Sequence, residues 1–386
     1  MNRLFDRNRI EVKPLAERKN KLDIQRDQID PASFTPELDA PAAESAGRVA
    51  AEVRAARARG APVILAFGAH TIKNGLSRVM IRLMEGGWVT HFATNGAGVI
   101  HDWEFAYQGR SGEDVKRYVA EGQFGIWEET GAYLNLAIAV GAYRGLGYGE
   151  AVGALVAEDG LLIPGGEELA AAIEAGAEQV GRPLEGAAAA AGEAVFARAA
   201  AAADLAALLA RFKVPSGRLS VEHPFKAYGL QAAAYTAGVP FTAHPMFGHD
   251  IIYTHPMNRG AAIGRAADLD FLAFTDSVSR LEGGVYLSVG SAVMSPMIFE
   301  KSLSMSRNIA RAQGGVIEDF SIEVVDLAKS AWDWTRDGEP PQDNPAYYLR
   351  FCKTFSRMGG RMTYTCADNR SFLVALLRAL EGDVRG

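Results

Sequence analysis

The sequence predicts an α/β protein with a Rossmann-like, mostly parallel sheet that is flanked by helices and interrupted by an alanine-rich helical insert. Three observations support this prediction. Short apolar runs end in glycine-rich turns, which is typical of strands buried on both faces of a parallel sheet. These runs alternate with segments of helical periodicity, as in doubly wound folds. Between two such blocks lies a long alanine-rich stretch, and alanine is the residue that most favours helix.

The first block of alternation follows a polar segment. Residues 1–40 are polar with scattered prolines and predict an arm or an irregular wrap, and the alternating basic and acidic side chains of the first 26 residues indicate a solvated stretch. Residues 41–59 combine Ala, Arg and Glu with apolar residues at helical spacing, and they predict a helix. Residues 62–70 then predict a buried strand, residues 71–85 a helix, and residues 88–98 a second strand that ends in a glycine-rich loop.

Residues 99–210 are expected to be mostly helical, with an insert at about 132–212 that serves packing or an oligomer contact. The elements expected after it are a helix over 223–238, a short strand over 239–245, a loop or short strand over 250–256, and a helix and then a strand within 261–275. A strand is expected over 283–290, and then a helix over 295–311 with Ser295 as its N-cap and Pro296 as its first helical residue. Strands over 320–327 and 361–368 and a helix over 369–382 follow. Residues 41–386 are therefore predicted to form a single domain.

Composition excludes several classes of protein. With 386 residues, 48% of them hydrophobic and 22% charged, the chain has an ordinary globular balance. The net charge of −6 argues against nucleic-acid binding, which normally needs a basic surface. No apolar run reaches the roughly 20 residues that span a bilayer. The two cysteines, Cys352 and Cys366, form no CxxC pair, which fits a reducing, cytoplasmic location.

Ligands of open parallel sheets bind beyond the carboxyl ends of the strands. Small residues follow apolar runs at 67–75, at 94–104, and at 282–284 with 289–292, where bare N–H groups are suited to hold a phosphate. The cofactor-binding candidates in these segments are His70, Asn74, Thr94, Asn95, Gly96, Gly98, Glu282, Gly283, Gly290 and Ser291. The full GxGxxG fingerprint and its later acidic residue are missing, so tight structural turns are an equal alternative.

The histidines are concentrated in one part of the chain. All seven lie between residues 70 and 255, and four fall within 223–255, where Asp250 adds a carboxylate. His101 and Glu104 form a second polar group. Histidine suits proton transfer at neutral pH, and with aspartate it also suits zinc or iron. The spacing fits no standard zinc motif, so we assign no metal ligand; a structural role is as plausible for any single histidine.

One lysine has an environment that favours nucleophilic chemistry. Lys353 lies two residues from an aromatic side chain on either side, Phe351 and Phe355. Partial desolvation lowers the pKa of a lysine and makes it a Schiff-base nucleophile. The alternative is a surface lysine on an amphipathic segment.

Six motifs together resemble a known family in their order and spacing. They are AHTIKNGL (69–76), ATNGAGVIHD (93–102), VPFTAHPMFGHDIIYTH (239–255), LSVGSAVMSPMI (287–298), YLRFCKT (348–354) and YTCADN (364–369). In these motifs the chain resembles the deoxyhypusine synthase family and its bacterial deoxyhypusine synthase-like relatives. The resemblance covers residues 60–130 and 222–380.

The resemblance implies a Rossmann-like NAD-binding sheet and a homotetramer whose subunits share active sites. It also implies that NAD oxidises an amine and that a lysine then forms an imine with the carbon skeleton to be transferred. Lys353 falls on that lysine. The residues that fall on nucleotide-binding positions are Asn74, Thr94, Gly96, Gly98, Gly290, Ser291 and Asp368.

The chain departs from the family where the family's acidic residues hold a polyamine. Residues 100–102 replace one acidic segment, and residues 338–346 give no clean match to another. A polyamine needs carboxylates around it. The sequence therefore predicts a small-molecule substrate other than spermidine, neutral or anionic, and a reaction other than deoxyhypusine synthesis.

The leading hypothesis is an NAD-dependent transferase of the deoxyhypusine synthase-like group that works by transient oxidation. Lys353 would hold a carbonyl intermediate, and His101 or His255 would move protons. The residues expected to orient the substrate are Glu104, His249 and Asp250. Two alternatives remain at this point: a hydrolase or lyase that uses the histidine and aspartate cluster with or without a metal, and a non-catalytic nucleotide-binding protein.

Overall fold

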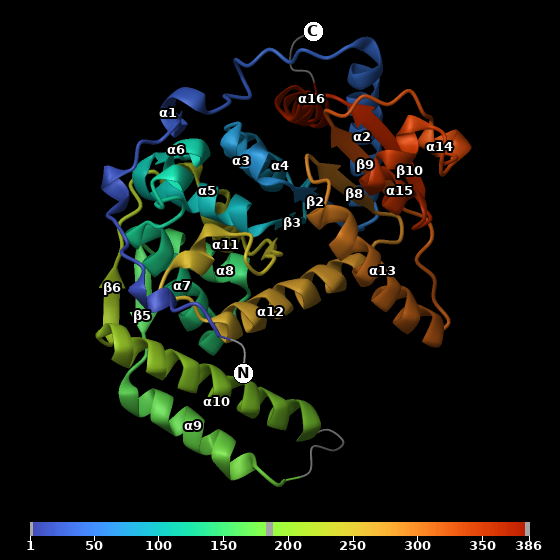
Figure 1. Ribbon diagram of the computed structural model, residues 1–386. Coiled ribbons are helices and arrows are strands. Elements are labelled where there is room, and N and C mark those ends of the chain that lie inside the picture. The colour runs from blue at the N-terminus through green and yellow to red at the C-terminus, as the bar shows by residue number, and fades with distance from the viewer. Residues whose placement is uncertain (1–2, 183–187, 383–386) are drawn as a thin grey trace.

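The protein is built around a six-stranded sheet in which every strand pairing is parallel (Figure 1). The computed structural model describes residues 3–182 and 188–382; residues 1–2, 183–187 and 383–386, which belong to the expected arm, insert and domain end, lie outside it. The strand order is β10-β9-β8-β2-β3-β7. The strands are β2 (Val63–Phe67), β3 (His91–Thr94), β7 (Phe241–Ala243), β8 (Val285–Val289), β9 (Ser321–Asp326) and β10 (Arg361–Cys366). The predicted Rossmann-like class is confirmed.

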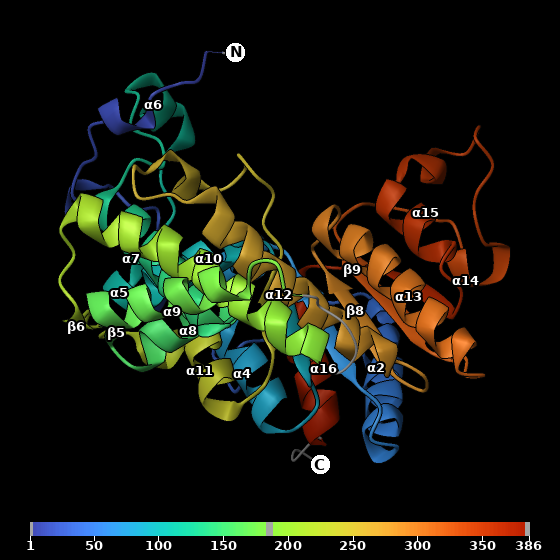
Figure 2. The same ribbon diagram turned by 90° about the horizontal axis from the view of Figure 1, so that it is seen from below.

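Both faces of the sheet are covered, as the uninterrupted apolar runs predict. Along β2, Val63 and Phe67 join one hydrophobic cluster, whereas Ile64 joins the other. The first face carries α2 (Ala40–Ala58), α4 (Ser77–Glu85) and α16 (Asn369–Glu381), and the second carries α12 (Gly260–Ser279), α13 (Met294–Ala312) and α15 (Arg350–Ser356). Figure 2 shows β8 and β9 between α13 and α15 on one side and α2 and α16 on the other.

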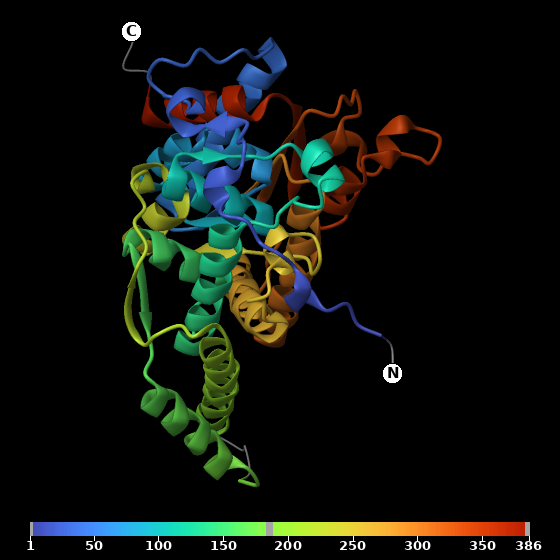
Figure 3. The same ribbon diagram turned by 60° about the vertical axis from the view of Figure 1, so that its left-hand side comes forward.

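The remaining elements lie mostly between β3 and β7. They are α5 (Gly96–Gln108), β4 (Arg110–Ser111), α6 (Val115–Ala120), α7 (Glu128–Arg144), α8 (Tyr148–Ala157), β5 (Gly160–Ile163), α9 (Gly166–Gln179), α10 (Ala188–Phe212), β6 (Gly217–Ser220), η3 (Lys226–Tyr228) and α11 (Leu230–Ala237). α9 and α10 pack together and project from the body (Figure 3). The two-stranded antiparallel sheet of β5 and β6 within this region was not expected.

The N-terminal arm is packed onto the domain as an irregular wrap, which corrects the expectation that its first 26 residues are solvated. Its elements are η1 (Arg7–Arg9), η2 (Leu15–Glu17), β1 (Leu22–Asp23) and α1 (Ile24–Asp27). β1 pairs antiparallel with β4, and the side chains of Leu15 and Ile24 are buried. Apolar residues spaced among the charges hold the arm in place, and this brings charged arm residues to the domain.

The helix expected over 71–85 is divided into α3 (Ala69–Lys73) and α4. Gly75, with φ of +74°, lies in the break. A side chain at this position would collide with the backbone of Asp27 in the arm. The break therefore follows from a tertiary contact between the arm and the turn.

The strand expected at residues 270–275 is wrong, because α12 continues through it. Asp270 accepts hydrogen bonds from the backbone N–H groups of Ala243 (2.7 Å) and Gly149 (2.9 Å), and so ties the helix to β7 and α8. Ser295 does not cap α13, which already begins at Met294. The expected helix over 223–238 shortens to η3 and α11, and 250–256 contains η4 (Ile251–Thr254). Near the C-terminus, α14 (Trp334–Asp337) and η5 (Pro345–Tyr348) precede α15.

No helix within residues 3–182 and 188–382 is long and apolar enough to cross a lipid bilayer.

Candidate functional site

The sheet changes its direction of winding between β2 and β8. From β2 the chain runs outward through β3 to β7, and from β8 it runs outward the other way through β9 to β10. This is the doubly wound order in which ligands bind beyond the carboxyl ends of the two central strands. The loops after β2 and β8 therefore bound the crevice in which a dinucleotide is expected.

Two glycines form the floor of this crevice. Gly68 follows β2 and caps α3, and its N–H donates to the carbonyl oxygen of Val289 at 3.2 Å. A Cβ atom at Gly68 would collide with the carbonyl oxygen of Gly290, whose own φ is +60°. Glycine at position 68 permits this close approach, and glycine at position 290 adopts the left-handed turn without strain. The loops after β2 and β8 therefore pack directly against each other at the carboxyl edge.

A pocket of about 190 Å³ lies beside the crevice, over the carboxyl ends of β2, β3 and β7. Its polar lining is Arg18, Lys73, His101, Glu104, Glu113, His249 and Asp250. Four of these, namely His101, Glu104, His249 and Asp250, were predicted from the sequence. They converge because α5 begins directly after β3 and the loop before η4 begins directly after β7.

Asp250 has a free carboxylate oxygen. The residue is 8% exposed, and its Oδ2 atom is buried without a hydrogen-bond partner among the described residues. The carboxylate rests on the first turn of α5, where a side chain at Gly96 would occupy the same space. Burial raises the pKa of Asp250 to about 7, although the positive end of the α5 dipole opposes this shift. Asp250 is therefore suited to exchange a proton near neutral pH.

Glu104, by contrast, is held as a carboxylate. Arg18 of the arm donates to its two oxygens at 2.6 Å each, and both side chains are 1% exposed. Thr130 donates to Glu104 as well, at 3.1 Å. Burial alone would raise the pKa of Glu104, but the charge and hydrogen bonds of Arg18 outweigh it and leave that pKa lowered. Glu104 is thus charge-balanced and unsuited to exchange protons.

His101 faces the pocket from the second turn of α5. Its Nδ1 atom lies 2.7 Å from the hydroxyl of Ser111 in β4. Burial lowers the pKa of His101 to about 4, against the opposing effect of Glu104. The ring is therefore neutral at physiological pH.

Three further residues complete the pocket. Lys73 ends α3 and brings a cation. Glu113 accepts hydrogen bonds from the indole N–H of Trp127 (2.9 Å) and the backbone N–H of Gly125 (3.1 Å), and burial raises its pKa. His249 lies exposed at the rim. Of the polar lining, only Arg18, Lys73 and Glu113 were not among the predicted site residues, and the position of Lys73 after the first strand was the one available signal.

Several predicted cofactor residues lie at the carboxyl edge, but their side chains form hydrogen bonds that hold the local fold. Thr94 donates to the carbonyl oxygen of Phe67 at 3.0 Å, and its hydroxyl excludes a side chain at Gly98. The others cap or bridge helices: Asn95 caps α5, Ser291 accepts from the N–H of Ser295, Asp368 caps α16, and Asn74 donates to Asn369 at 2.8 Å. His70 lies beside them and is exposed as a whole residue. Partial burial of its ring and the charge of Lys73 lower its pKa.

Glu282 and Gly283 do not join this group, which corrects the expectation that they follow a strand. They precede β8, so they lie at the amino edge of the parallel sheet. The carboxylate of Glu282 accepts instead from the backbone N–H groups of Glu318 (2.6 Å) and Asp319 (3.1 Å). A five-residue strand separates them from Gly290 by roughly 17 Å.

Lys353 and His255 also lie outside the pocket. Lys353 is in α15, which packs beside β10, and its Nζ atom lies 3.6 Å from the centre of the Tyr347 ring. Four strand spacings, or about 19 Å, separate β10 from β3. His255 is buried, and its Nδ1 atom accepts from the N–H of Met257 at 3.1 Å. Lys353 is therefore remote from His101 and Asp250 within one chain, whereas His255 packs against Gly131, next to Thr130, and is absent from the pocket lining.

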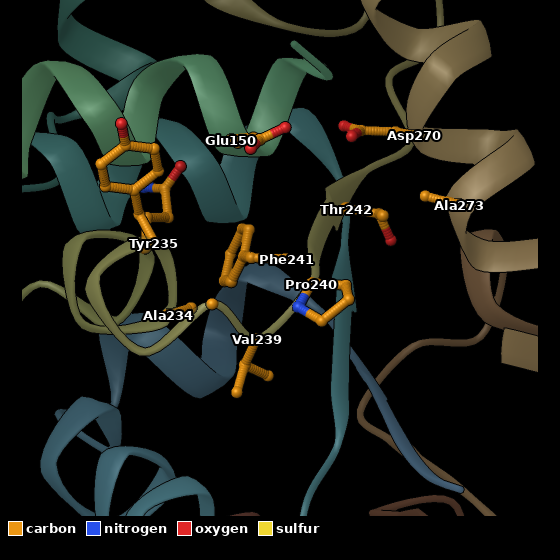
Figure 4. A pocket seen from close by; sticks show the side chains of 11 residues that line it. Glu150, Ala234, Tyr235, Val239, Pro240, Phe241, Thr242, Asp270 and Ala273 are labelled. Atoms are coloured by element: carbon orange, nitrogen blue, oxygen red, sulfur yellow. The ribbon is translucent and has the colours of Figure 1, made fainter.

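A second cavity, of about 240 Å³, lies beside the edge strand β7 near its amino end (Figure 4). Glu150 and Asp270 face each other at one end of it, as Figure 4 shows. Asp270 is engaged by backbone donors, and burial raises its pKa to about 8. Because this cavity is away from the carboxyl edge, it is not the candidate site. Among the described residues, no group of three His, Cys, Asp or Glu side chains is placed to hold a metal ion.

Comparison with known proteins gives distant similarity only. No protein-family model and no curated protein matches the chain. Among solved structures, unliganded AgrE is 14% identical with a TM-score of 0.42, over 89% of this chain and 33% of AgrE. ArgZ, an arginine dihydrolase from the ornithine-ammonia cycle in cyanobacteria, is 13% identical with a TM-score of 0.40, over 87% of this chain and 32% of ArgZ. A conserved putative LOR/SDH protein from Methanococcus maripaludis S2 is 11% identical with a TM-score of 0.40, over 92% of this chain and 74% of that protein.

The chain thus spans about a third of the length of AgrE and ArgZ. The resemblance to deoxyhypusine synthases rests on the sequence motifs, and the Rossmann-like fold that it implied is the part that the structure confirms.

Proposed function

We propose that the protein is an NAD-dependent enzyme that acts on a small polar molecule by transient oxidation. One observation carries this proposal: the loops after β2 and β8, where a doubly wound sheet binds its dinucleotide, lie at the same carboxyl edge as a pocket lined by Asp250, a carboxylate whose pKa burial raises to about 7. Oxidation of an alcohol or amine needs a hydride acceptor and a proton acceptor side by side.

The residues at the crevice fit NAD in part. Lys73 brings a positive charge beside the loop after β2, whereas the N–H groups of Gly68 and Gly290 are already donated to the carbonyl oxygens of Val289 and Val325. Asn95 occupies the end of β3, where dinucleotide-binding folds often place an acidic residue, and its side chain caps α5. NAD, when bound, supplies the hydride acceptor.

The chain's own residues would divide the remaining work. Asp250 takes a proton from the substrate hydroxyl or amine, because its pKa lies near neutrality. His101 is neutral and accepts a hydrogen bond. Lys73 attracts an anionic group or a carbonyl oxygen. A pocket of about 190 Å³ is smaller than the roughly 300–1,000 Å³ of drug-sized sites, which favours a small metabolite.

The transferase reaction that the resemblance implies requires an imine between a lysine and the substrate. Lys73 lines the pocket, whereas Lys353 would have to serve a site completed by another copy of the chain. Borohydride reduction in the presence of candidate amines, followed by peptide mapping, decides between them. A reduced adduct on Lys353 supports the shared-site transferase, an adduct on Lys73 assigns the imine to the pocket, and the absence of an adduct from both removes the imine step.

Self-association is a further part of the proposal. Apolar side chains are exposed along α13 at Met297, Met305 and Ile309 and at its N-cap residue Val293, with the exposed Lys301 between Met297 and Met305. Such a ridge suits helix packing against a second copy, and it supports a homo-oligomer such as the homotetramer that the resemblance implies. Light scattering of the purified protein measures the state directly.

The decisive test of the function is NAD binding. Mass spectrometry of the small molecules released on heat denaturation, together with calorimetric titration of NAD, should show about one NAD per chain. Gly68→Ala should abolish binding, whereas Asp250→Asn should bind NAD and lose turnover. If the wild-type chain binds no NAD, the oxidation chemistry falls. Asp250 and His101 would then serve a proton-transfer reaction without a cofactor, as in a lyase.

A further inference from the structure

Three side chains connect His101 to the arm in one continuous chain of hydrogen bonds. The Nδ1 atom of His101 lies 2.7 Å from the hydroxyl oxygen of Ser111, and that hydroxyl lies 2.5 Å from Oε2 of Glu104. Arg18 holds Glu104 from the opposite side. His101 and Glu104 come from α5, Ser111 from β4, and Arg18 from the arm, so three segments are needed to assemble the chain.

The direction of each hydrogen bond follows from the charges. Glu104 is ionised, because Arg18 binds both of its oxygens, so it can only accept. The single hydroxyl proton of Ser111 must therefore be donated to Glu104, since two acceptor oxygens 2.5 Å apart would repel each other. The oxygen of Ser111 is then free only to accept, and the hydrogen between it and His101 must belong to Nδ1.

We propose that Glu104 and Ser111 are positioning residues that fix His101 in the tautomer with a hydrogen on Nδ1 and a bare lone pair on Nε2. His101 lines the pocket, and its Nε2 atom has no hydrogen-bond partner among the described residues. A ligand group that meets this atom must donate a hydrogen. The site therefore selects a hydroxyl or amine group at this point and disfavours a carbonyl oxygen or a carboxylate.

Burial keeps the ring neutral, and most of the surrounding charges act in the same direction. Lys73 from α3, Arg18 from the arm and His70 all oppose protonation of His101, whereas Glu104 favours it, and burial is the largest effect. The substrate preference rests on the function proposed above. The tautomer itself does not, because it is a property of the free protein.

The experiment is NMR of the full-length protein labelled with ¹⁵N at histidine. Long-range ¹H–¹⁵N correlations identify which ring nitrogen carries the hydrogen, because the bare nitrogen resonates far downfield of the protonated one. His101→Gln removes one ring and thereby assigns the His101 signals among the seven histidines. In the wild-type protein we expect His101 wholly in the Nδ1–H form; an Nε2–H form or a mixture overturns the proposal without any other variant.

Two variants test the cause. Ser111→Ala removes the acceptor of Nδ1–H, and His101 should shift toward the Nε2–H form, whereas Ser111→Thr should restore the wild-type pattern. Thr130→Val is the matched control, because it removes another hydrogen bond to Glu104 and leaves Ser111 in place. An unchanged His101 signal in Ser111→Ala refutes the role of Ser111. A confirmed tautomer in a protein that binds no NAD would refute only the proposed function.

Discussion

Arg18→Met should destabilise the protein far more than the loss of an arginine usually does. Glu104, 1% exposed, would be left as a buried carboxylate with its neutralising partner removed. Breaking a buried ion pair in this way costs about 3–5 kcal/mol. Thr130 and Ser111 would still donate to Glu104, so we expect about 3 kcal/mol, the lower end of that range.

The sign of the pH dependence should also reverse. In the wild-type protein the pKa of Glu104 is lowered, so this group stabilises the fold above its unfolded pKa and loses that contribution as the pH falls. Without Arg18, burial dominates and raises the folded-state pKa above the unfolded one. The variant should then lose stability from Glu104 as the pH rises through the raised pKa.

Urea denaturation followed by tryptophan fluorescence, at about pH 5 and about pH 8, measures both effects. Arg26→Met is the matched control, because Arg26 also pairs with a carboxylate but is 66% exposed, and its loss should leave the stability nearly unchanged. Arg18→Met/Glu104→Gln should recover most of the stability, because the buried charge is gone. A cost below about 1 kcal/mol for Arg18→Met, or an unchanged pH dependence, would refute the assignment of Glu104 as a buried, arginine-balanced carboxylate.

Further substitutions test the crevice, the pocket and the frame that supports them. Gly68→Ala should lower the free energy of unfolding by about 1–3 kcal/mol in a denaturation experiment, because its Cβ atom would collide with the carbonyl oxygen of Gly290. Gly264→Ala is the control, because the space around Gly264 is open, and it should be neutral or stabilising. Equal effects of the two substitutions would contradict the close approach at Gly68. Asp250→Asn should be more stable than the wild-type protein by on the order of 2–4 kcal/mol above about pH 7 and equally stable below about pH 4. The reason is that a carboxyl group with a raised pKa costs stability as the pH rises. A difference that does not change with pH would argue against the raised pKa. Asp102→Ala should lower the urea midpoint strongly, because the Asp102 carboxylate accepts from the first N–H groups of α11, and a small change would show that water replaces it.

The sequence could predict the sheet because its strands need no tertiary information to be recognised. β2 and β8 are five-residue apolar runs that are buried on both faces. Residues 270–275 have the same local character, yet they are helical, since a short apolar run cannot by itself be distinguished from a buried helix segment. The contacts of Asp270 with β7 and α8 decide the outcome, and they are not visible in a local pattern.

The candidate site was predictable in the same partial way. His101 and Asp250 were found because they follow strands β3 and β7 and because such residues suit proton transfer. Arg18 was missed because its partner lies 86 residues away and the charges around it are typical of a solvated segment. Glu282 was misplaced because a glycine-rich turn looks alike at either end of a strand, whereas only one end of a parallel sheet binds ligands.

The charge balance of the pocket separates this site from one that binds a polyamine. A polyamine needs several free carboxylates, since each ammonium group must be paired when it leaves water. Glu104 is already paired with Arg18, and Asp250 titrates near neutrality, so Glu113 is the remaining acid of the lining and Lys73 opposes it. Such a pocket is close to neutral overall, and in the proposed tautomer the Nε2 atom of His101 can only accept a hydrogen bond. A small molecule with one hydroxyl or amine and one anionic or carbonyl group satisfies Asp250, His101 and Lys73 together, whereas spermidine would leave Lys73 facing a like charge.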